Sequence, residues 1–246
     1  MHLWLEFRPW YFPVEAQPSN NTTVTVIHSN VQSSNNQYQK LIHWLEQEQP
    51  DVFVVQEVTD AWITALHPLN NQYPHQVIHP RTDNFGIALY SKYPLSHIQT
   101  HYWPPAELPS IEVTIHKQTN SFSLITTHPL PPISKAYHAA RNQQIQAAIL
   151  AANTQSLPTI LIGDMNLTPW EPDYTALLTA KKNLLSNTRI GQGILPTWPT
   201  FFLPAAIAID HCFISPEWET SQMVTGPDIG SDHLPIKVTL KLPNQL

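Results

Sequence analysis

Short runs of apolar and β-branched residues, separated by turns that often contain proline, form the main pattern along this chain. These runs predict strands at 23–30, 51–56, 73–78, 85–90, 111–116, 121–127, 159–162, 207–214 and 236–240. Apolar residues at helical spacing predict helices from 36 to just before Pro50, at 61–66, at 134–153 and from 169 to near 180. Because strands and helices mix without strict alternation, the pattern favours an α/β fold with two sheets and outer helices over a singly wound parallel sheet.

One predicted strand, at 159–162, leads directly into polar residues that could form part of a site. Gly163 frees the backbone to turn, so Asp164 and Asn166 stand at the carboxyl end of the strand. Ligands bind at this end of the strands in open α/β sheets. An ordinary turn would also explain Gly, Asp and Asn. Two further stretches, Ile209-Asp210-His211 and 230–236 with Asp232, also place acids near strand ends, and together the three indicate one site.

Composition and charge limit the classes of protein to consider. A chain of 246 residues with 42% hydrophobic content can form one large domain, which we expect at 23–246 after an extension at 1–22. The net charge of -6, with only 12 Lys plus Arg, weighs against tight, sequence-independent binding to duplex DNA. The single cysteine, Cys212, excludes an internal disulfide and is expected to be a small buried residue. No obligate protein partner is evident, so we expect a monomer.

The extension at 1–22 is rich in aromatic residues: Trp4, Phe7, Trp10, Tyr11 and Phe12. It lacks the apolar run of about 20 residues that crosses a bilayer, and the chain as given is expected to be soluble. The aromatic cluster is either an interfacial segment beside a membrane or a tail packed on the domain. Localisation therefore stays open between the cytoplasm and the extracytoplasmic face of a membrane.

The candidate chemistry lies at the predicted strand ends. The polar residues there are Asn30, Glu57, His128, Asp164, Asn166, Asp210, Asp232 and His233. Hard oxygen ligands without cysteine suit Mg²⁺ or Mn²⁺ rather than zinc. A histidine beside a carboxylate suits proton transfer or the stabilisation of developing charge. The chain has 13 histidines, so most must be incidental, and His211 inside a predicted strand is expected to be structural.

Six short motifs occur in an order that resembles the endonuclease/exonuclease/phosphatase superfamily, which includes DNase I. They are Asn30, Gln56-Glu57-Val58, Thr127-His128, Gly163-Asp164-Met165-Asn166, Ile209-Asp210-His211 and Ser231-Asp232-His233. The resemblance spans roughly residues 23 to 242 and implies a DNase I-like four-layer sandwich with two central mixed β-sheets flanked by helices. The phrases at 86–91, 141–144 and 196–199 further resemble a bacterial branch that is often membrane-anchored.

The resemblance also implies roles for individual residues in hydrolysing phosphoesters with Mg²⁺ or Mn²⁺. Glu57 would be the principal metal ligand, and Asn30 and Asp232 would complete the metal and phosphate environment. Asp164 would orient or deprotonate the attacking water, and Asn166 would hold a phosphoryl oxygen. His233, oriented by Asp210, would stabilise charge or act as general base, with His128 as the acid for the leaving oxygen. Arg141 could reach a phosphate, although a salt bridge or a cap explains it equally well.

The substrate stays open at this point. Within the superfamily it could be a nucleic acid cut by an endonuclease, a phospholipid, an inositol phosphate or a small diester. A catalytically inactive binding module is a further alternative. We disfavour it because every expected polar position is present.

Overall fold

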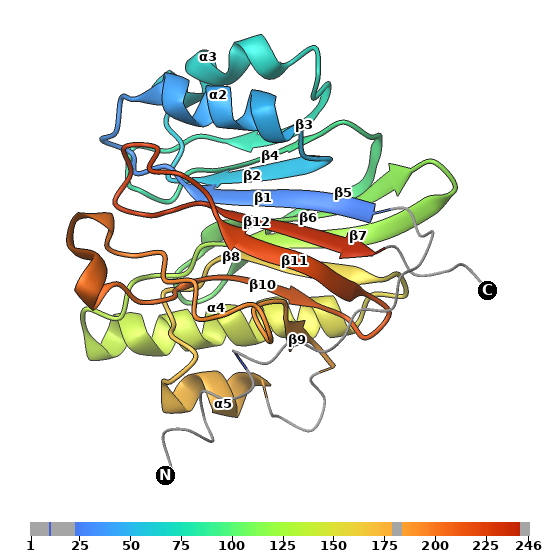
Figure 1. Ribbon diagram of the computed structural model, residues 1–246. Coiled ribbons are helices and arrows are strands. Elements are labelled where there is room, and N and C mark those ends of the chain that lie inside the picture. The colour runs from blue at the N-terminus through green and yellow to red at the C-terminus, as the bar shows by residue number, and fades with distance from the viewer. Residues whose placement is uncertain (1–9, 11–22, 179–183, 242–246) are drawn as a thin grey trace.

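The computed structural model describes residues 10, 23–178 and 184–241, which form two six-stranded sheets between outer helices (Figure 1). The first sheet has the order β11 (Glu219–Thr225), β12 (Ile236–Lys241), β1 (Thr23–Asn30), β2 (Val52–Gln56), β4 (Ile87–Ser91) and β3 (His75–His79). The second has the order β5 (Leu95–Trp103), β6 (Leu108–Lys117), β7 (Asn120–Thr127), β8 (Thr159–Asp164), β10 (Asp210–Ile214) and β9 (Ser186–Asn187). Both sheets are mixed, since β1–β2 and β7–β8 are parallel pairs among antiparallel ones.

Helices cover the outer face of each sheet. The first sheet carries α2 (Tyr38–Glu48), α3 (Asp60–Leu66) and the 3-10 turn η1 (His67–Leu69), and the second carries α4 (Lys135–Asn153) and α5 (Pro172–Leu178) (Figure 1). A further 3-10 segment, η2 (Thr200–Ala205), lies in a loop. The predicted four-layer sandwich of two mixed sheets flanked by helices is therefore confirmed.

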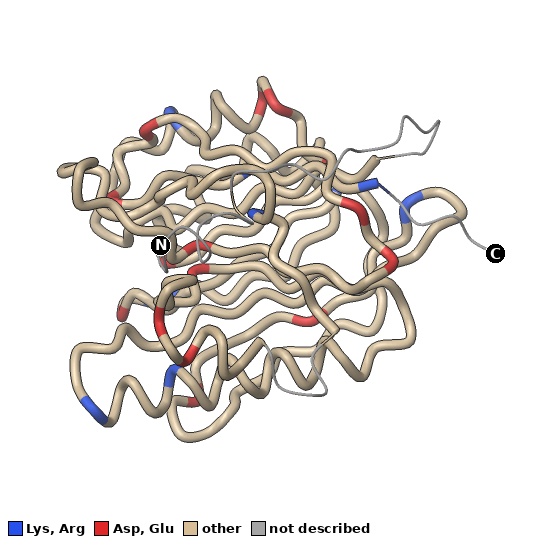
Figure 2. The backbone as a smooth tube through the Cα atoms, turned by 60° about the horizontal axis from the view of Figure 1, so that its bottom comes forward, with Lys and Arg blue, Asp and Glu red and all other residues tan. Residues whose placement is uncertain are grey.

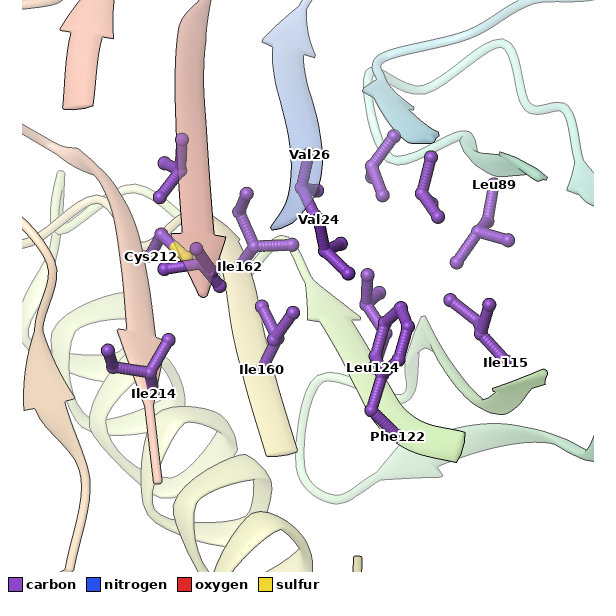
Figure 3. Packing of buried hydrophobic residues seen from close by; sticks show 14 of the residues in the cluster. Val24, Val26, Leu89, Ile115, Phe122, Leu124, Ile160, Ile162, Cys212 and Ile214 are labelled. Carbon is purple, nitrogen blue, oxygen red and sulfur yellow. The ribbon is translucent and has the colours of Figure 1, made fainter. Parts of the chain in front are cut away.

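Central strands form the layers because both of their faces are apolar. In β1, Val24 and Val26 point between the two sheets, whereas Ile27 packs beneath the outer helices. In β8, Ile160 and Ile162 face the same space between the sheets (Figure 3), and Leu161 faces α4. Successive side chains of a strand point to opposite faces, so these runs are buried on both sides.

The predicted helix at 134–153 is confirmed with its cap and its buried stripe. The hydroxyl of Ser134 accepts a hydrogen bond from the Tyr137 amide at 3.2 Å. The stripe consists of Ile145, Ala148, Ile149 and Ala152, all buried against the second sheet.

Two strands, β5 and β11, lack the apolar runs that predict the other long strands. Both are edge strands, and most of their side chains are exposed or half-buried. An edge strand pairs with one neighbour, and its solvent-exposed face carries polar residues. The apolar pattern therefore predicts neither strand. The two-residue β9 was also not predicted.

Trp10 is the one described residue of the aromatic extension. It is buried against the cluster beneath α4 and α5, and its carbonyl accepts a hydrogen bond from the Gly193 amide at 2.7 Å. The other four aromatic residues lie outside the described residues, and the boundary at 22 stays a prediction. Among the described residues, we find no helix with the length and apolarity to span a membrane.

Candidate active site

The ends of β1, β2 and β8 meet at one edge of the sandwich, where Asn30 connects the two sheets. Its amide nitrogen donates to Glu57 Oε1 at 3.0 Å and to Asp164 Oδ2 at 3.2 Å. The parallel register pairs Asn30 with Gln56, so Glu57 follows beside it. The three residues are brought together as predicted.

Local backbone geometry presents these side chains. Glu57 and Asn166 have positive φ angles of 62° and 49°, which turn the chain sharply after each strand. At Gly163, an added Cβ would lie 2.2 Å from the Thr127 carbonyl oxygen. Only glycine therefore allows β8 to approach β7 closely enough to set Asp164 in place.

Asp164 is buried at the centre of the site. Its backbone amide donates to Gln56 Oε1 at 3.0 Å, and its Oδ1 accepts from the Asn166 amide at 2.9 Å. Its Oδ2 lies 3.5 Å from His128 Nε2 and 3.6 Å from His233 Nε2. Burial alone would raise the pKa of Asp164, but the charge of His233 and the His128 contact leave its pKa below the usual value.

Asp210 lies between two histidines. Its Oδ2 is 2.9 Å from His233 Nδ1, the expected contact, and its Oδ1 is 2.8 Å from His28 Nε2. Burial opposes ionisation of Asp210, but His233 and His28 hold its pKa well below the usual value. Burial also lowers the pKa of His233, but the charges of Asp210 and Asp164 outweigh it and raise this pKa to about 10. His233 is therefore an imidazolium at neutral pH, facing Asp164 through Nε2.

Arg141 lies behind the site rather than in it. The side chain is fully buried; its Nη1 donates to the Asn166 carbonyl oxygen at 2.7 Å and to Glu171 Oε2 at 3.0 Å. Nη2 lies 3.4 Å from Asp173 Oδ2. These contacts correspond to the salt-bridge alternative. The hydrogen bond to the Asn166 carbonyl oxygen also fixes the loop that carries Asn166.

A pocket of about 570 Å³ opens over the site. Six of the predicted residues line it: Glu57, His128, Asp164, Asn166, Asp232 and His233. Asn30, Arg141 and Asp210 lie behind this lining. Asp232 Oδ2 accepts from Trp198 Nε1 at 3.0 Å, so Trp198, which also lines the pocket, positions this carboxylate.

The donor set fits a hard cation at Glu57. Each Glu57 oxygen has one described donor, Asn30 Nδ2 or the Ser33 amide at 3.2 Å, and a carboxylate can accept about four. Asn30 turns its nitrogen toward Glu57 while its Oδ1 accepts from the Gln32 amide, so here it positions the carboxylate. Asp164, Asp210 and His233 also lie within 4.8 Å of one another, but the Asp210 oxygens already bind two rings. That buried group does not suit a cation.

Comparison with known proteins agrees with this geometry. Residues 27–233 match the model of the Endonuclease/Exonuclease/phosphatase family. The chain belongs to this family. Members of the family are hydrolases that act on phosphoesters and use divalent metals.

Solved structures share the fold at low sequence identity. Humanized D. rerio TDP2 is 16% identical with a TM-score of 0.76, covering 89% of this chain and 99% of that one. An endonuclease/exonuclease/phosphatase from Beutenbergia cavernae is 17% identical with a TM-score of 0.74, covering 90% and 72%. A family protein from Leptotrichia buccalis is 17% identical with a TM-score of 0.71, covering 89% and 100%. A comparison with curated proteins found no match.

Three residues that support the site of this family member were not predicted from the sequence. His28 binds Asp210, Gln56 holds the Asp164 amide, and Arg189 donates to the Asp210 carbonyl oxygen at 2.6 Å. His28 and Gln56 lie within predicted strands. Gln56 also belongs to the Gln56-Glu57-Val58 motif, whereas a buried polar residue was the only available signal for His28. His211 and Cys212 are structural as expected: both are buried, and burial raises the Cys212 pKa to about 12.

Proposed function

We propose that this protein hydrolyses a phosphodiester or a phosphomonoester by in-line attack of water, with Mg²⁺ or Mn²⁺ held mainly by Glu57. The observation that carries the proposal is the Asn30 bridge between Glu57 and Asp164, with the His233–Asp210 pair facing the same carboxylate. Phosphoryl transfer depends more on positioning and charge neutralisation than on covalent chemistry. One pocket holds groups for both tasks.

We assign each residue a role that its contacts support. Asp164 orients the attacking water and accepts its proton, while the His233 imidazolium stabilises charge on the phosphoryl oxygens. Asn166 gives one side-chain N–H to the Pro129 carbonyl oxygen at 3.1 Å, which leaves the other for a phosphoryl oxygen. His128 protonates the leaving oxygen. A cation bound at Glu57, with Asp232 nearby, would polarise the phosphoryl group and lower the pKa of water.

Endonuclease activity is one form of this reaction. D. rerio TDP2, a neighbour in fold, was solved in complex with a single-strand DNA product. A phospholipid or an inositol phosphate would suit the same polar set. The inactive binding module is disfavoured because six predicted polar residues line one pocket.

The test is hydrolysis of bis(4-nitrophenyl) phosphate and 4-nitrophenyl phosphate with Mg²⁺ or Mn²⁺, with and without EDTA. Wild-type protein should be active only with the metal. Asp164→Asn should lose at least about 100-fold in kcat, whereas the exposed-site control Glu219→Gln should not. Metal-independent turnover, or full activity of Asp164→Asn, would contradict the proposal.

A further inference from the structure

The mouth of the pocket carries a strongly exposed apolar patch. In η2, Phe201, Phe202 and Leu203 are 80%, 56% and 61% exposed. Ile133, which lines the pocket, is 78% exposed. Three consecutive apolar side chains this exposed, Phe201, Phe202 and Leu203, are typical of an interaction site in a soluble domain.

The position of this patch follows from the way its loop is held. Trp198 and Ile207 pair at the base of the loop: the Trp198 amide donates to the Ile207 carbonyl at 3.1 Å, and the reverse bond is 2.6 Å. Both residues line the pocket, so the loop between them projects from its edge. Ile133 also lines the pocket, and η2 and the start of α4 lie at the same end of the molecule (Figure 1).

The two loops at the mouth, 129–134 and 199–206, are named here the apolar rim. They contain Pro, Leu, Ile, Phe, Ala, Ser and Thr, and no Asp, Glu, Lys, Arg or His. A nucleic acid would require several cations beside its phosphates. Arg81 is bound by Asp83 and Arg141 by Glu171, which leaves the exposed Lys135, directly after the first rim loop, as a single described cation beside the rim. An uncharged apolar rim instead matches the interfacial region of a bilayer of neutral or zwitterionic lipid.

We propose that the apolar rim embeds in a lipid surface and places the pocket over the phosphoester of a membrane phospholipid. This rests on the proposed function and narrows its substrate class. The polar residues at the pocket floor meet the headgroup phosphate. Phe201, Phe202, Leu203 and Ile133 contact the acyl region around it, where water is excluded from their surfaces.

The binding test uses the full chain and sucrose-loaded phosphatidylcholine vesicles. Wild-type protein should sediment with the vesicles, and Phe201→Ser/Phe202→Ser/Leu203→Ser should lose at least about 10-fold in partitioning. A matched triple variant, Ile98→Ser/Leu150→Ser/Leu184→Ser, removes three exposed apolar residues elsewhere and should bind like wild type. The single variant Phe201→Ser, with a measured unfolding midpoint, guards against a folding defect.

Other outcomes would overturn the proposal. The proposal is wrong if wild-type protein stays in the supernatant, or if the rim variant sediments as wild type does. It is also wrong if the rim variant loses binding to single-stranded DNA but keeps its binding to vesicles. A wild-type dimer that dissociates only in the rim variant would also contradict it. Asp164→Asn separates this proposal from the reaction: it should be inactive yet bind vesicles. Vesicle binding without hydrolysis of any phosphoester by wild type would refute the proposed function but leave the lipid-binding surface.

Discussion

The ring of His233 lies almost fully buried between two carboxylates, and its charge depends on them. Asp210 binds Nδ1 at 2.9 Å and Asp164 lies 3.6 Å from Nε2. Burial favours the neutral ring, so the raised pKa of about 10 arises from the two negative charges. His233 therefore suits the stabilisation of negative charge better than the role of general base.

Asp210→Asn should remove the carboxylate charge that has the larger effect on the pKa of His233. Burial, which favours the neutral ring, would then be opposed by fewer charges, and the pKa of His233 should fall from about 10. At pH 7 kcat should drop by about 10²- to 10⁴-fold, and it should recover in part as the pH falls and the ring is protonated. NMR titration of His233 with parallel kcat measurements tests this, with Asp60→Asn as control. An unchanged pKa would show that Asp210 does not set the charge of the ring.

Glu57→Gln should keep the fold and weaken metal binding by at least about 100-fold. Glutamine has the same length and retains one oxygen for Asn30, but it loses the negative charge that attracts a hard cation. Calorimetric titration with Mn²⁺ measures the affinity. Asp83→Asn is the matched control, because Asp83 also lines the pocket but is bound by Arg81. Equal affinities of wild type and Glu57→Gln would rule out Glu57 as principal ligand.

His211 should make stability depend on pH. Its Nδ1 accepts from Asn187 at 3.0 Å and its Nε2 donates to the Leu167 carbonyl at 2.8 Å, so the ring is neutral. Burial, then the charge of Arg189, lowers its pKa from 6.5 to about 3. Because the unfolded chain takes up the proton first, stability is full above pH 6.5 and is lost as the pH falls toward 3.

The slope due to His211 should be up to about 1.4 kcal/mol per pH unit. Urea unfolding between pH 7 and 4.5 measures it, above the range in which Asp164 and Asp210 titrate. His211→Gln should show a flatter slope whatever its stability at pH 7. Parallel slopes would mean that another group causes the acid sensitivity.

At the scale of elements, α4 is joined to the site by one buried cation. Arg141 connects α4 to the Asn166 carbonyl and to Glu171, just before α5. Arg141→Lys keeps the charge but cannot reach the Asn166 carbonyl, Glu171 and Asp173 together, since it lacks the guanidinium fork. We expect kcat to fall about 10-fold with little change in KM, and a loss of about 1–3 kcal/mol in stability. Steady-state kinetics and thermal unfolding test this, with Lys135→Ala on the same helix as the control. A rise in KM of about 10-fold with unchanged kcat would instead indicate that Arg141 contacts the substrate directly.

The central strands that the sequence predicted are buried on two faces. β1, β2 and β8 have apolar runs because they lie between the other sheet and a helix layer. The sequence of α4 contains both its N-terminal cap and its buried apolar stripe, so this helix could also be predicted. β5 and β11 were missed because each lies at a sheet edge with a polar face. Their placement depends on pairing with distant strands, and no local pattern records such pairing.

The candidate site follows the same division. Asn30, Glu57 and Asp164 could be predicted to meet, since each stands at or just after the end of a buried strand. His28 could not, because it lies inside β1 and reaches Asp210 across 182 positions. Arg141 was predicted only as an alternative between phosphate and salt bridge, and its burial beside Glu171 required the packing of α4 and α5.

At the scale of the whole molecule, basic residues are scattered and mostly paired. Figure 2 shows no continuous line of Lys and Arg along the described tube. The ion pairs are Lys40–Asp228, Arg81–Asp83, Lys117–Asp51, Arg141–Glu171, Lys237–Glu48 and Lys241–Glu219. Arg189 is buried against carbonyl groups. A long polyanion therefore finds few free cations on the part of the chain that the structure describes.

Catalysis should consequently depend only weakly on salt. A protein that makes 6–10 phosphate contacts loses about 10³-fold or more in affinity between about 50 and 200 mM salt. Here the net charge is -6, so each additional phosphate of a long strand adds repulsion rather than a contact. The slope of log(kcat/KM) against log[salt] should be shallow and alike for long DNA, short DNA and a small diester at fixed Mg²⁺. A steep slope on long DNA alone would reveal a basic track that the described residues do not show, and would favour a dedicated nuclease.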